Sequence, residues 1–237
     1  MTGGSGGAKT AAFFDVDGTC VDATIVHYYV YFRRRLLPPA LRPVWYGGFL
    51  FKCLYYLLLD RRDRSLFNVR FYRNYAGMSA ERVRGMVDAC HREVIEPRIF
   101  PHALSCISAH RSAGRRIVLL TGSLDFIVAP LAEKVRADAV IAPTMTESEG
   151  RFTGRLNGPP IGDEEKARRL TAFAEREGID LAGSYAYADS LADLPVLEKV
   201  GHPNVVNPDG KLERIARERR WPVLRWTRPS RKGGDKP

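Results

Sequence analysis

The stretch Ala11-Ala12-Phe13-Phe14-Asp15-Val16-Asp17-Gly18-Thr19 decides the fold of this 237-residue chain. Four apolar residues followed by two carboxylates and a glycine are typical of a buried strand that ends in a polar turn. Gly18 lets the backbone curl, so that a carboxylate and a main-chain carbonyl can face the same ligand. The stretch therefore predicts a core strand with a ligand site at its carboxyl end.

The same pattern of an apolar run followed by a polar turn recurs along the chain, and helical patterns with charged faces lie between several of the runs. Strands that alternate with helices predict an α/β fold with a parallel sheet flanked by helices, in which ligand sites form beyond the carboxyl ends of the strands. The further strands are expected at residues 116–120, 139–142, 185–188 and 204–206, and the helices at residues 101–113, 124–136 and 164–177.

The segment of residues 21–100 breaks this alternation, because it is aromatic, rich in arginine and helix-like, with no clear core strand. We expect it to be a helical cap inserted after the first strand, so that residues 11–20 and 101–226 form the catalytic core. Residues 144–156, with two glycines, predict a small β-hairpin near the site. The Gly-rich residues 1–10 predict a flexible leader, and residues 227–237 a disordered basic tail.

The net charge of +10 is unevenly distributed. Residues 21–100 hold fourteen Lys and Arg against seven Asp and Glu, and residues 211–237 hold ten against three. This pattern fits either a solvated basic surface or an attraction for anionic substrates or anionic membranes. A hydrophobic content of 45% and a charged content of 27% exclude a disordered chain and a polytopic membrane protein.

The four cysteines show neither a CxxC motif nor the spacing of a metal site, and no apolar signal segment precedes them. We therefore expect reduced thiols and a cytoplasmic protein. The cysteines are Cys20, Cys53, Cys90 and Cys106.

Asp15 and Asp17 have the chemistry for phosphoryl transfer. One carboxylate can attack phosphorus to form an aspartyl-phosphate, and the other can protonate the leaving alkoxide and then deprotonate the attacking water. Carboxylate and carbonyl oxygens are also the ligands that Mg²⁺ prefers. The alternative is that two aspartates at a strand end only form a turn.

Three other elements strengthen the first interpretation. Thr121-Gly122-Ser123 follows a predicted strand and offers a hydroxyl and main-chain N–H groups for phosphate oxygens, although it could also be a helix N-cap. Lys166 could neutralise the phosphate and the Asp15 carboxylate, or be a surface lysine. Asp189 follows a strand as a candidate metal ligand, and Asp193 lies four residues later.

In this order the motifs resemble those of the haloacid-dehalogenase superfamily of aspartate-nucleophile hydrolases, in the branch that includes phosphoserine phosphatase (subfamily IB). The resemblance covers nearly the whole chain, from residue 11 to about residue 226. The family pattern DxDGT matches residues 15–19, its Ser/Thr motif matches Thr121, its lysine matches Lys166, and its acidic motif matches Asp189 and Asp193.

The resemblance implies a Rossmann-like core, a helical cap after the first motif and Mg²⁺ as cofactor. It implies that Mg²⁺ is held by Asp15, the main-chain carbonyl of Asp17, and Asp189. Asp15 would be the nucleophile and Asp17 the acid/base, which favours a phosphatase over a dehalogenase. Thr121, Gly122 and Lys166 are expected to bind the phosphate, and Asp193, Thr19 and Ser190 to support the metal ligands.

The chain departs from phosphoserine phosphatases at two places. Thr24 stands where those enzymes carry a glutamate nine residues after the nucleophile, which speaks against phosphoserine as the substrate. The glycine-rich acidic motif is replaced by Ala188-Asp189-Ser190-Leu-Ala-Asp193, which keeps the carboxylates. His27 is the histidine closest to a motif; it is expected to pack in the cap, with a role in substrate contact as the alternative.

Residues 44–59 of the cap are sixteen residues with a single charge. As a helix they span about 24 Å, short of the roughly 30 Å hydrocarbon core of a bilayer, and a crossing here would separate Asp15 from Lys166. Three interpretations remain open: a helix buried in the cap or in a homodimer, a helix lying on a membrane surface, and a hydrophobic pocket for an amphiphilic substrate.

The predicted function is a Mg²⁺-dependent phosphomonoester hydrolase that acts on a small or amphiphilic organic phosphate. One alternative is a lysophospholipid-type phosphatase at the membrane surface, and another is a non-catalytic binding protein that keeps the fold. The basic tail with Trp221 and Trp226 could contact RNA or anionic lipid, but no nucleic-acid module accompanies it, so a nucleic-acid partner is not expected.

Overall fold

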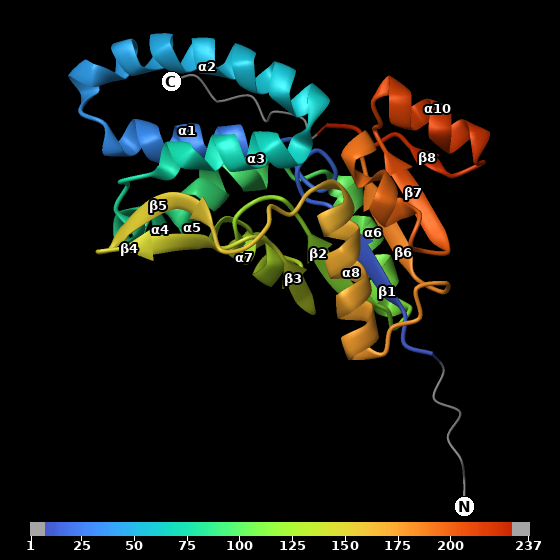
Figure 1. Ribbon diagram of the computed structural model, residues 1–237. Coiled ribbons are helices and arrows are strands. Elements are labelled where there is room, and N and C mark those ends of the chain that lie inside the picture. The colour runs from blue at the N-terminus through green and yellow to red at the C-terminus, as the bar shows by residue number, and fades with distance from the viewer. Residues whose placement is uncertain (1–7, 229–237) are drawn as a thin grey trace, which may run out of the picture.

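The computed structural model describes residues 8–228, which form a sheet flanked by helices and a helical cap beside it (Figure 1). The sheet has six parallel strands in the order β3-β2-β1-β6-β7-β8. This confirms the predicted α/β class. The strands are β1 (Ala11–Phe14), β2 (Arg116–Leu120), β3 (Ala139–Ile141), β6 (Tyr185–Ala188), β7 (His202–Val206) and β8 (Val223–Leu224).

Strand β1 lies at the centre of the sheet because all four of its residues are apolar and buried. Successive side chains of a strand point to opposite faces, so Ala12 and Phe14 enter one hydrophobic cluster and Ala11 and Phe13 the other. Hydrogen-bonded neighbours on both sides, β2 and β6, fix the position of the residues that follow. The backbone position of Asp15, the first residue of the loop after β1, is therefore fixed by the sheet.

The helices of the core cover both faces of this sheet. Helices α6 (Pro101–Ser112) and α7 (Asp125–Lys134) contribute Ile107 and Leu131 to the cluster of Phe14. Helices α8 (Asp163–Glu177), α9 (Leu194–Leu197) and α10 (Gly210–Glu218) supply the cluster of Phe13 on the other face. The three helices expected from the charged patterns between the strands are thus present.

The cap consists of helical segments between β1 and α6, and its core is aromatic. Tyr29 packs against Phe49, Phe71 and Tyr75 at ring-centroid distances of 5.3, 5.6 and 5.2 Å. The segments are α1 (Ile25–Leu36), η1 (Pro39–Leu41), α2 (Arg42–Arg62), α3 (Arg64–Tyr72), η2 (Arg73–Tyr75), α4 (Ala80–Arg84), α5 (Val87–Cys90), a π-helical turn η3 (His91–Ile95) and η4 (Glu96–Arg98).

The expected hairpin is formed by β4 (Met145–Ser148) and β5 (Arg151–Leu156), which are antiparallel. It belongs to the cap side of the molecule, where Gly77 donates its N–H to the Phe152 carbonyl at 2.8 Å. Figure 1 shows the hairpin on one side of α1 and α3, and α2 as the outermost helix on the other. Within residues 8–228, no helix combines the length and the hydropathy that crossing a membrane requires.

The two connections between core and cap run side by side. Phe100 donates its N–H to the Cys20 carbonyl, and Asp22 donates to the Arg98 carbonyl, each at 2.9 Å. Val21 and Ile99 form an antiparallel bridge between them. The chain therefore leaves the core and returns to it through one hydrogen-bonded pair of linkers.

One residue of the predicted leader and one residue of the predicted tail contact the rest of the protein. Lys9, assigned to the leader by its composition, forms a parallel bridge with Ile179, and its carbonyl accepts a hydrogen bond from Asp180. Arg228, assigned to the basic tail, forms an ion pair with Asp22 at 3.0 Å. Residues 1–7 and 229–237, the rest of the predicted leader and tail, lie outside the described residues.

Candidate active site

Three loops that leave the carboxyl ends of neighbouring strands converge on one point. Asp15 follows β1, Thr121 follows β2 and Asp189 follows β6. The loops start in register, since Asp15 donates its N–H to the Tyr187 carbonyl at 3.0 Å. Parallel strands place their carboxyl ends at one edge of the sheet, so polar residues far apart in sequence meet there.

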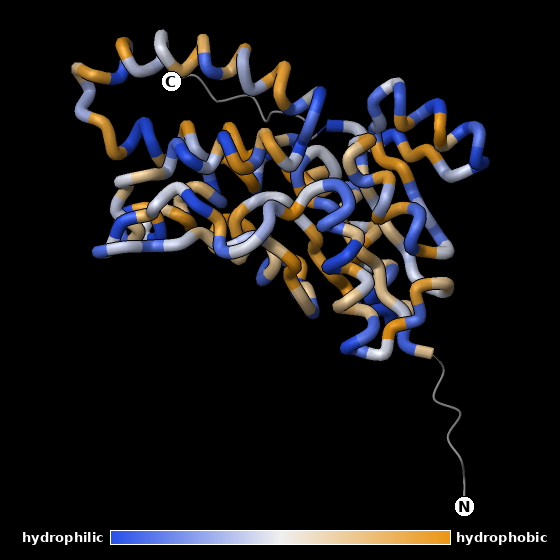
Figure 2. The backbone as a smooth tube through the Cα atoms, in the orientation of Figure 1, coloured by the Kyte–Doolittle hydropathy of each residue, from blue (hydrophilic) through white to orange (hydrophobic). Residues whose placement is uncertain are grey.

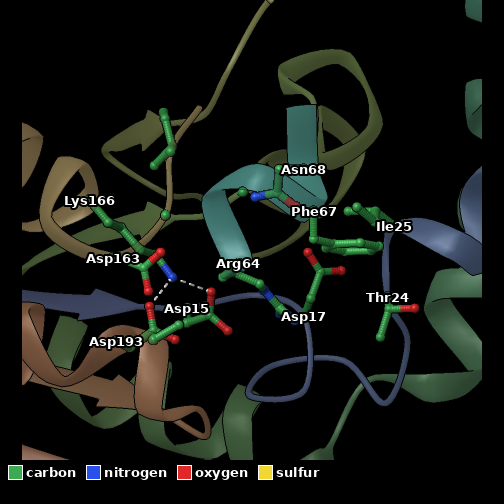
Figure 3. A pocket seen from close by; sticks show the side chains of 14 residues that line it. Asp15, Asp17, Thr24, Ile25, Arg64, Phe67, Asn68, Asp163, Lys166 and Asp193 are labelled. Atoms are coloured by element: carbon green, nitrogen blue, oxygen red, sulfur yellow. Dashed lines mark hydrogen bonds and ion pairs between the residues drawn. The ribbon is translucent and has the colours of Figure 1, made fainter. Parts of the chain in front are cut away.

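Lys166 joins this edge from the first turn of α8. Its ammonium donates to Asp15 Oδ1 at 2.6 Å and to Asp193 Oδ1 at 2.5 Å, and all three side chains are buried (Figure 3). A lysine at this depth is stable only when its charge is compensated. The alternative of a surface lysine is excluded by this burial.

The charges in this cluster shift one another's ionisation. Burial raises the pKa of Asp15 to about 7, against the attraction of Lys166, and the negative charges of Asp193 and Asp17 add to the rise. Burial would lower the pKa of Lys166, but its ion pairs with Asp15 and Asp193 raise it above the usual value. The lysine therefore stays charged and holds the Asp15 carboxylate in place.

Asp189 completes an acidic cluster beside this pair. One carboxylate oxygen from each of Asp15, Asp189 and Asp193 lies within 4.8 Å of the other two. Burial, and then the charges of Asp15 and Asp193, raise the pKa of Asp189 well above its usual value. Thr19 donates its hydroxyl to Asp189 Oδ1 at 3.2 Å. Three carboxylates around a single ammonium leave negative charge that a bound cation would balance.

Gly18 is required by the contact between two of these loops. Its φ is +90°, and a Cβ built there would lie 2.2 Å from Asp189 Oδ2. No side chain fits into that space, and an L-residue would also be strained at this φ. The glycine therefore allows the loop after β1 to lie directly against the carboxylate after β6.

The carboxylate of Asp17 lies on the cap side of the pocket. Tyr28 of α1 donates its hydroxyl to Asp17 Oδ1 at 2.8 Å, and Ser123 donates to Oδ2 at 2.6 Å. Burial raises the pKa of Asp17, while the hydrogen bonds from Ser123 and Tyr28 oppose the rise. This carboxyl group is thus separate from the acidic cluster and is suited to hold a proton.

The segment Thr121-Gly122-Ser123 lies beside these carboxylates, and its Gly122 lines the pocket. Thr121 donates its hydroxyl to Asp17 Oδ2 at 3.3 Å and accepts a hydrogen bond from the Ser123 N–H at 3.0 Å. Helix α7 begins later, at Asp125, and Leu124 is its N-cap residue. The alternative of an ordinary N-cap therefore does not apply to Thr121.

The cap closes the pocket from above. Arg64, Phe67 and Asn68 of α3 line it together with Asp15, Asp17 and Lys166 (Figure 3). Its volume is about 40 Å³, far below the roughly 300–1,000 Å³ of typical ligand sites. Cap-to-core hydrogen bonds surround it: Tyr72 donates to the Gly122 carbonyl at 2.6 Å, and Ser65 donates to Asp163 at 3.0 Å. A substrate therefore requires the cap to open.

Ser190 and His27 lie beside the site and do not line the pocket. The hydroxyl of Ser190 accepts a hydrogen bond from the Ala192 N–H at 3.2 Å and caps the turn that carries Asp193. His27 contacts Thr24 at the start of α1, and the pocket lining does not include it. His27 lies on α1 of the cap as expected, but it is exposed and is not packed inside the cap.

Sequence reasoning missed the residues that reach the site through the fold of the cap. Arg64 enters the pocket from α3, and its guanidinium forms an ion pair with Asp60 at 2.6 Å. Tyr28 approaches from α1 and contacts Asp17. The cap contains many arginines and many aromatic residues, so the sequence does not indicate that Arg64 and Tyr28 are the ones that reach the site.

Comparisons with known proteins agree with this arrangement. The model of the haloacid dehalogenase-like hydrolase family matches residues 12–198. A probable phosphatase of Mycobacterium tuberculosis is 36% identical over 232 residues, which cover 94% of this chain and 77% of that protein. A histidinol-phosphatase of Neisseria meningitidis is 31% identical over 189 residues, 70% of this chain and 85% of that protein.

A solved structure of a substrate-bound phosphoserine phosphatase superposes with a TM-score of 0.70 at 17% identity, covering 91% of this chain and 92% of that one. At this identity the likeness concerns the fold alone, and it confirms the Rossmann-like core with a cap. The family match spans every motif from the first strand to the acidic loop. The chain therefore belongs to the haloacid dehalogenase-like hydrolase family and is an enzyme of its phosphatase branch.

Proposed function

We propose that the chain is a Mg²⁺-dependent phosphomonoesterase in which Asp15 forms an aspartyl-phosphate. One observation carries the proposal: the buried Lys166 ammonium holds Asp15 and Asp193, with Asp189 beside them. A carboxylate fixed in this way cannot rotate away from a bound phosphate. The lysine also supplies a positive charge where negative charge develops during transfer.

The donor set fits Mg²⁺. The cluster offers only oxygen ligands: the buried carboxylates of Asp15 and Asp193 and the half-buried carboxylate of Asp189, whose mutual repulsion a divalent cation would relieve. Asp15, Asp189 and the main-chain carbonyl of Asp17 are the proposed ligands, and Asp193 holds Lys166. When bound, the ion would neutralise phosphate oxygens and draw them toward Asp15.

Asp15 and Asp17 divide the chemistry. In the first half-reaction a carboxylate oxygen of Asp15 attacks phosphorus, the ester P–O bond breaks, and Asp17 gives its proton to the leaving alkoxide. In the second, Asp17 takes a proton from water, the water oxygen attacks phosphorus, and the bond to Asp15 breaks. Inorganic phosphate leaves, and both aspartates return to their starting states.

Thr121, Gly122 and Lys166 are the proposed phosphate contacts. The Thr121 hydroxyl and the main-chain N–H groups of its loop are hydrogen-bond donors at the rim of the cluster. Tyr72 fixes this loop through the Gly122 carbonyl. Thr19 and Ser190 serve as supports, the first by its hydrogen bond to Asp189 and the second by capping the turn of Asp193.

We propose a small or amphiphilic organic phosphate as the substrate. Thr24 lines the pocket where the resemblance would place a glutamate, so phosphoserine is disfavoured. The similar proteins are named for different substrates: one is a histidinol-phosphatase and another a phosphoserine phosphatase. The four cysteines are free thiols, so the cytoplasm remains the proposed compartment.

Replacement of the nucleophile tests the proposal. We expect Asp15→Asn to lower kcat for p-nitrophenyl phosphate by about 10³-fold or more, because an amide does not attack phosphorus. Asp125→Asn, at an exposed acid in the first turn of α7, is the matched control and should retain activity. Mg²⁺-dependent turnover by a folded Asp15→Asn protein would remove the nucleophile assignment.

Two binding measurements test the same site without turnover. Mg²⁺ should raise the melting temperature of the wild-type protein and have little effect on Asp189→Asn, because the variant lacks one carboxylate of the cluster. Beryllium fluoride with Mg²⁺ should give a bound ¹⁹F signal in the wild type and none in Asp15→Asn. A panel of phosphorylated metabolites that includes phosphoserine and lysophosphatidate would then identify the leaving group.

A further inference from the structure

Helix α2 presents a large apolar surface to solvent. Nine of the twelve exposed large hydrophobic residues in the described chain lie within residues 41–58. Scattered apolar residues are normal on a protein surface, whereas a contiguous patch marks an interaction site. We define the α2 outer face by six residues with exposed fractions of 51–78%: Val44, Leu50, Phe51, Leu54, Tyr55 and Leu58.

The attachment of α2 to the cap is narrow. Phe49 and Tyr56, two turns apart, are its buried residues. Phe49 packs against Tyr29 at 5.3 Å, and Tyr56 against Phe71 at 5.4 Å. Figure 2 shows hydrophobic residues along the whole length of α2, and Figure 1 shows it at the edge of the molecule. Trp45, Cys53 and Leu59 are partly buried against the same cluster, and the α2 outer face on the opposite side of the helix is available to a partner.

Basic residues stand at both ends of the α2 outer face. Residues 33–73 contain ten Lys and Arg against two acidic residues. One of the two, Asp60, is held by Arg64. Arg34 near the start of α2 and Arg62 at its end are exposed, and neither forms an ion pair with another described residue. The apolar strip is therefore flanked by uncompensated positive charge.

We propose that the α2 outer face docks on the surface of an anionic lipid bilayer. The apolar side chains enter the boundary between headgroups and acyl chains, and Arg34 and Arg62 contact lipid phosphates. The exposed Tyr46 and Tyr55 are of the type that settles at this depth. The helix lies on the membrane and does not cross it, in agreement with the absence of a spanning helix from residues 8–228.

Charge decides between a bilayer and a second copy of the chain. Two copies packed through α2 in antiparallel fashion would bring the Arg34 end of one against the Arg62 end of the other. A parallel pair would bring like ends together. Both arrangements place positive charge against positive charge, whereas an anionic surface compensates both ends at once.

Docking also has a consequence for access to the site. A cleft of about 810 Å³ beside the end of α2 is lined by Asp60 and Arg62 from the cap and by Lys211 from the core. It shares Arg64, Asp163 and Ala192 with the catalytic pocket. Docking therefore turns the mouth of the pocket toward the headgroups. The docking itself is independent of the proposed reaction.

Flotation of the full chain with lipid vesicles tests the proposal. We expect the protein to float with phosphatidylcholine vesicles that contain about 30% phosphatidylglycerol and to stay in the dense fraction with phosphatidylcholine alone. Raising the salt from about 0.1 M to about 0.5 M should weaken binding several-fold, since the Debye length shortens. Equal flotation with both vesicle types would overturn the role of the arginines.

Paired variants separate the surface from general hydrophobicity. Phe51→Glu combined with Leu58→Glu should lower the vesicle partition coefficient about tenfold or more, because two apolar anchors become charged. Leu104→Glu combined with Val140→Glu, at exposed apolar positions of the core, is the matched control and should bind like the wild type. Arg34→Glu combined with Arg62→Glu should lower binding to anionic vesicles by about tenfold or more.

Turnover of p-nitrophenyl phosphate in solution should be the same in the Phe51→Glu, Leu58→Glu protein and in its core control, which shows that both are folded. Wild-type binding by the Phe51→Glu, Leu58→Glu protein would overturn the proposal. So would a stable dimer in sedimentation equilibrium that this variant abolishes, since the second copy would then be the occupant of the surface.

Discussion

The two walls of the catalytic pocket are built on different principles. The core wall consists of buried charges that hold one another, with Lys166 between Asp15 and Asp193. The cap wall consists of aromatic and polar side chains from helices, among them Phe67 and Arg64. The core side chains thereby determine the type of reaction, because their ion pairs hold the carboxylates in one arrangement. The cap has no such constraint, and we propose that it is the part that selects the leaving group.

The largest expected effect comes from breaking the core wall at its only ammonium. Lys166→Met should lower kcat by about 10³-fold, because Asp15 loses its partner and the transferred phosphoryl group loses a positive charge. Arg168→Met, on the same helix with 65% of its side chain exposed, is the matched control. A Lys166→Met enzyme with near-normal kcat would assign the lysine a purely structural role.

A smaller effect is expected where two core loops touch. Gly18→Ala should lower activity and Mg²⁺ affinity by about tenfold to a hundredfold, because the new methyl group displaces Asp189. Gly114→Ala separates this clash from backbone strain, since Gly114 also has a positive φ, of +72°, but nothing within 4 Å of an added Cβ. That control should cost about 1 kcal/mol of stability and leave kcat unchanged. Equal kinetic losses in both variants would refute the steric explanation.

A variant of the cap wall tests the other half of the comparison. Arg64→Met should lower kcat/KM by about tenfold, because a charge-assisted contact in the pocket is lost. The loss should vary between substrates, whereas Lys166→Met should affect all of them equally. Arg62→Met changes an exposed neighbour and serves as the control in solution. A uniform loss across a substrate panel would mean that Arg64 acts on the reaction and not on selection.

The smallest effect on turnover is expected at His110, within the core but away from the pocket. Burial, with a contribution from Arg115, lowers the pKa of His110 from 6.5 to about 4. The unfolded chain therefore binds a proton at pH values where the folded protein does not, and stability falls as the pH drops from 6.5 to 4. His110→Gln removes this proton and retains a partner for the Tyr187 hydroxyl, which lies 2.7 Å from the histidine ring.

At about pH 4.5 the free energy of unfolding of the wild type should have lost about 2–3 kcal/mol more than that of His110→Gln, relative to pH 7. Urea denaturation at the two pH values measures this difference. Parallel pH curves for the two proteins would show that the ring is protonated in the native state.

The core could be predicted from sequence because its signals are local. Each strand is a short apolar run that ends in polar residues, and the rules of a parallel sheet bring those ends together. Asp15 and Asp189 could be placed at one edge of the sheet on that basis, and the family resemblance added Lys166 and Asp193; the structure has the four in contact or within a few ångströms.

The cap could not be predicted to the same depth. Its helices pack through aromatic side chains that are common throughout the segment, so no pattern indicates which tyrosine or arginine turns inward. Tyr28 and Tyr29 are adjacent in sequence, yet the first contacts Asp17 and the second lies in the aromatic core of the cap. The π-helical turn at His91–Ile95 shifts the register of the returning chain, and no sequence signal marked it.

The paired linkers determine how the closed pocket can open. Because residues 20–22 and 98–100 are hydrogen-bonded to each other, neither linker can extend alone. We infer that the cap opens as a swing about this pair of linkers and carries with it the hairpin β4–β5, which is hydrogen-bonded to the cap. Such a swing is smallest near the linkers and largest at the far end of the cap.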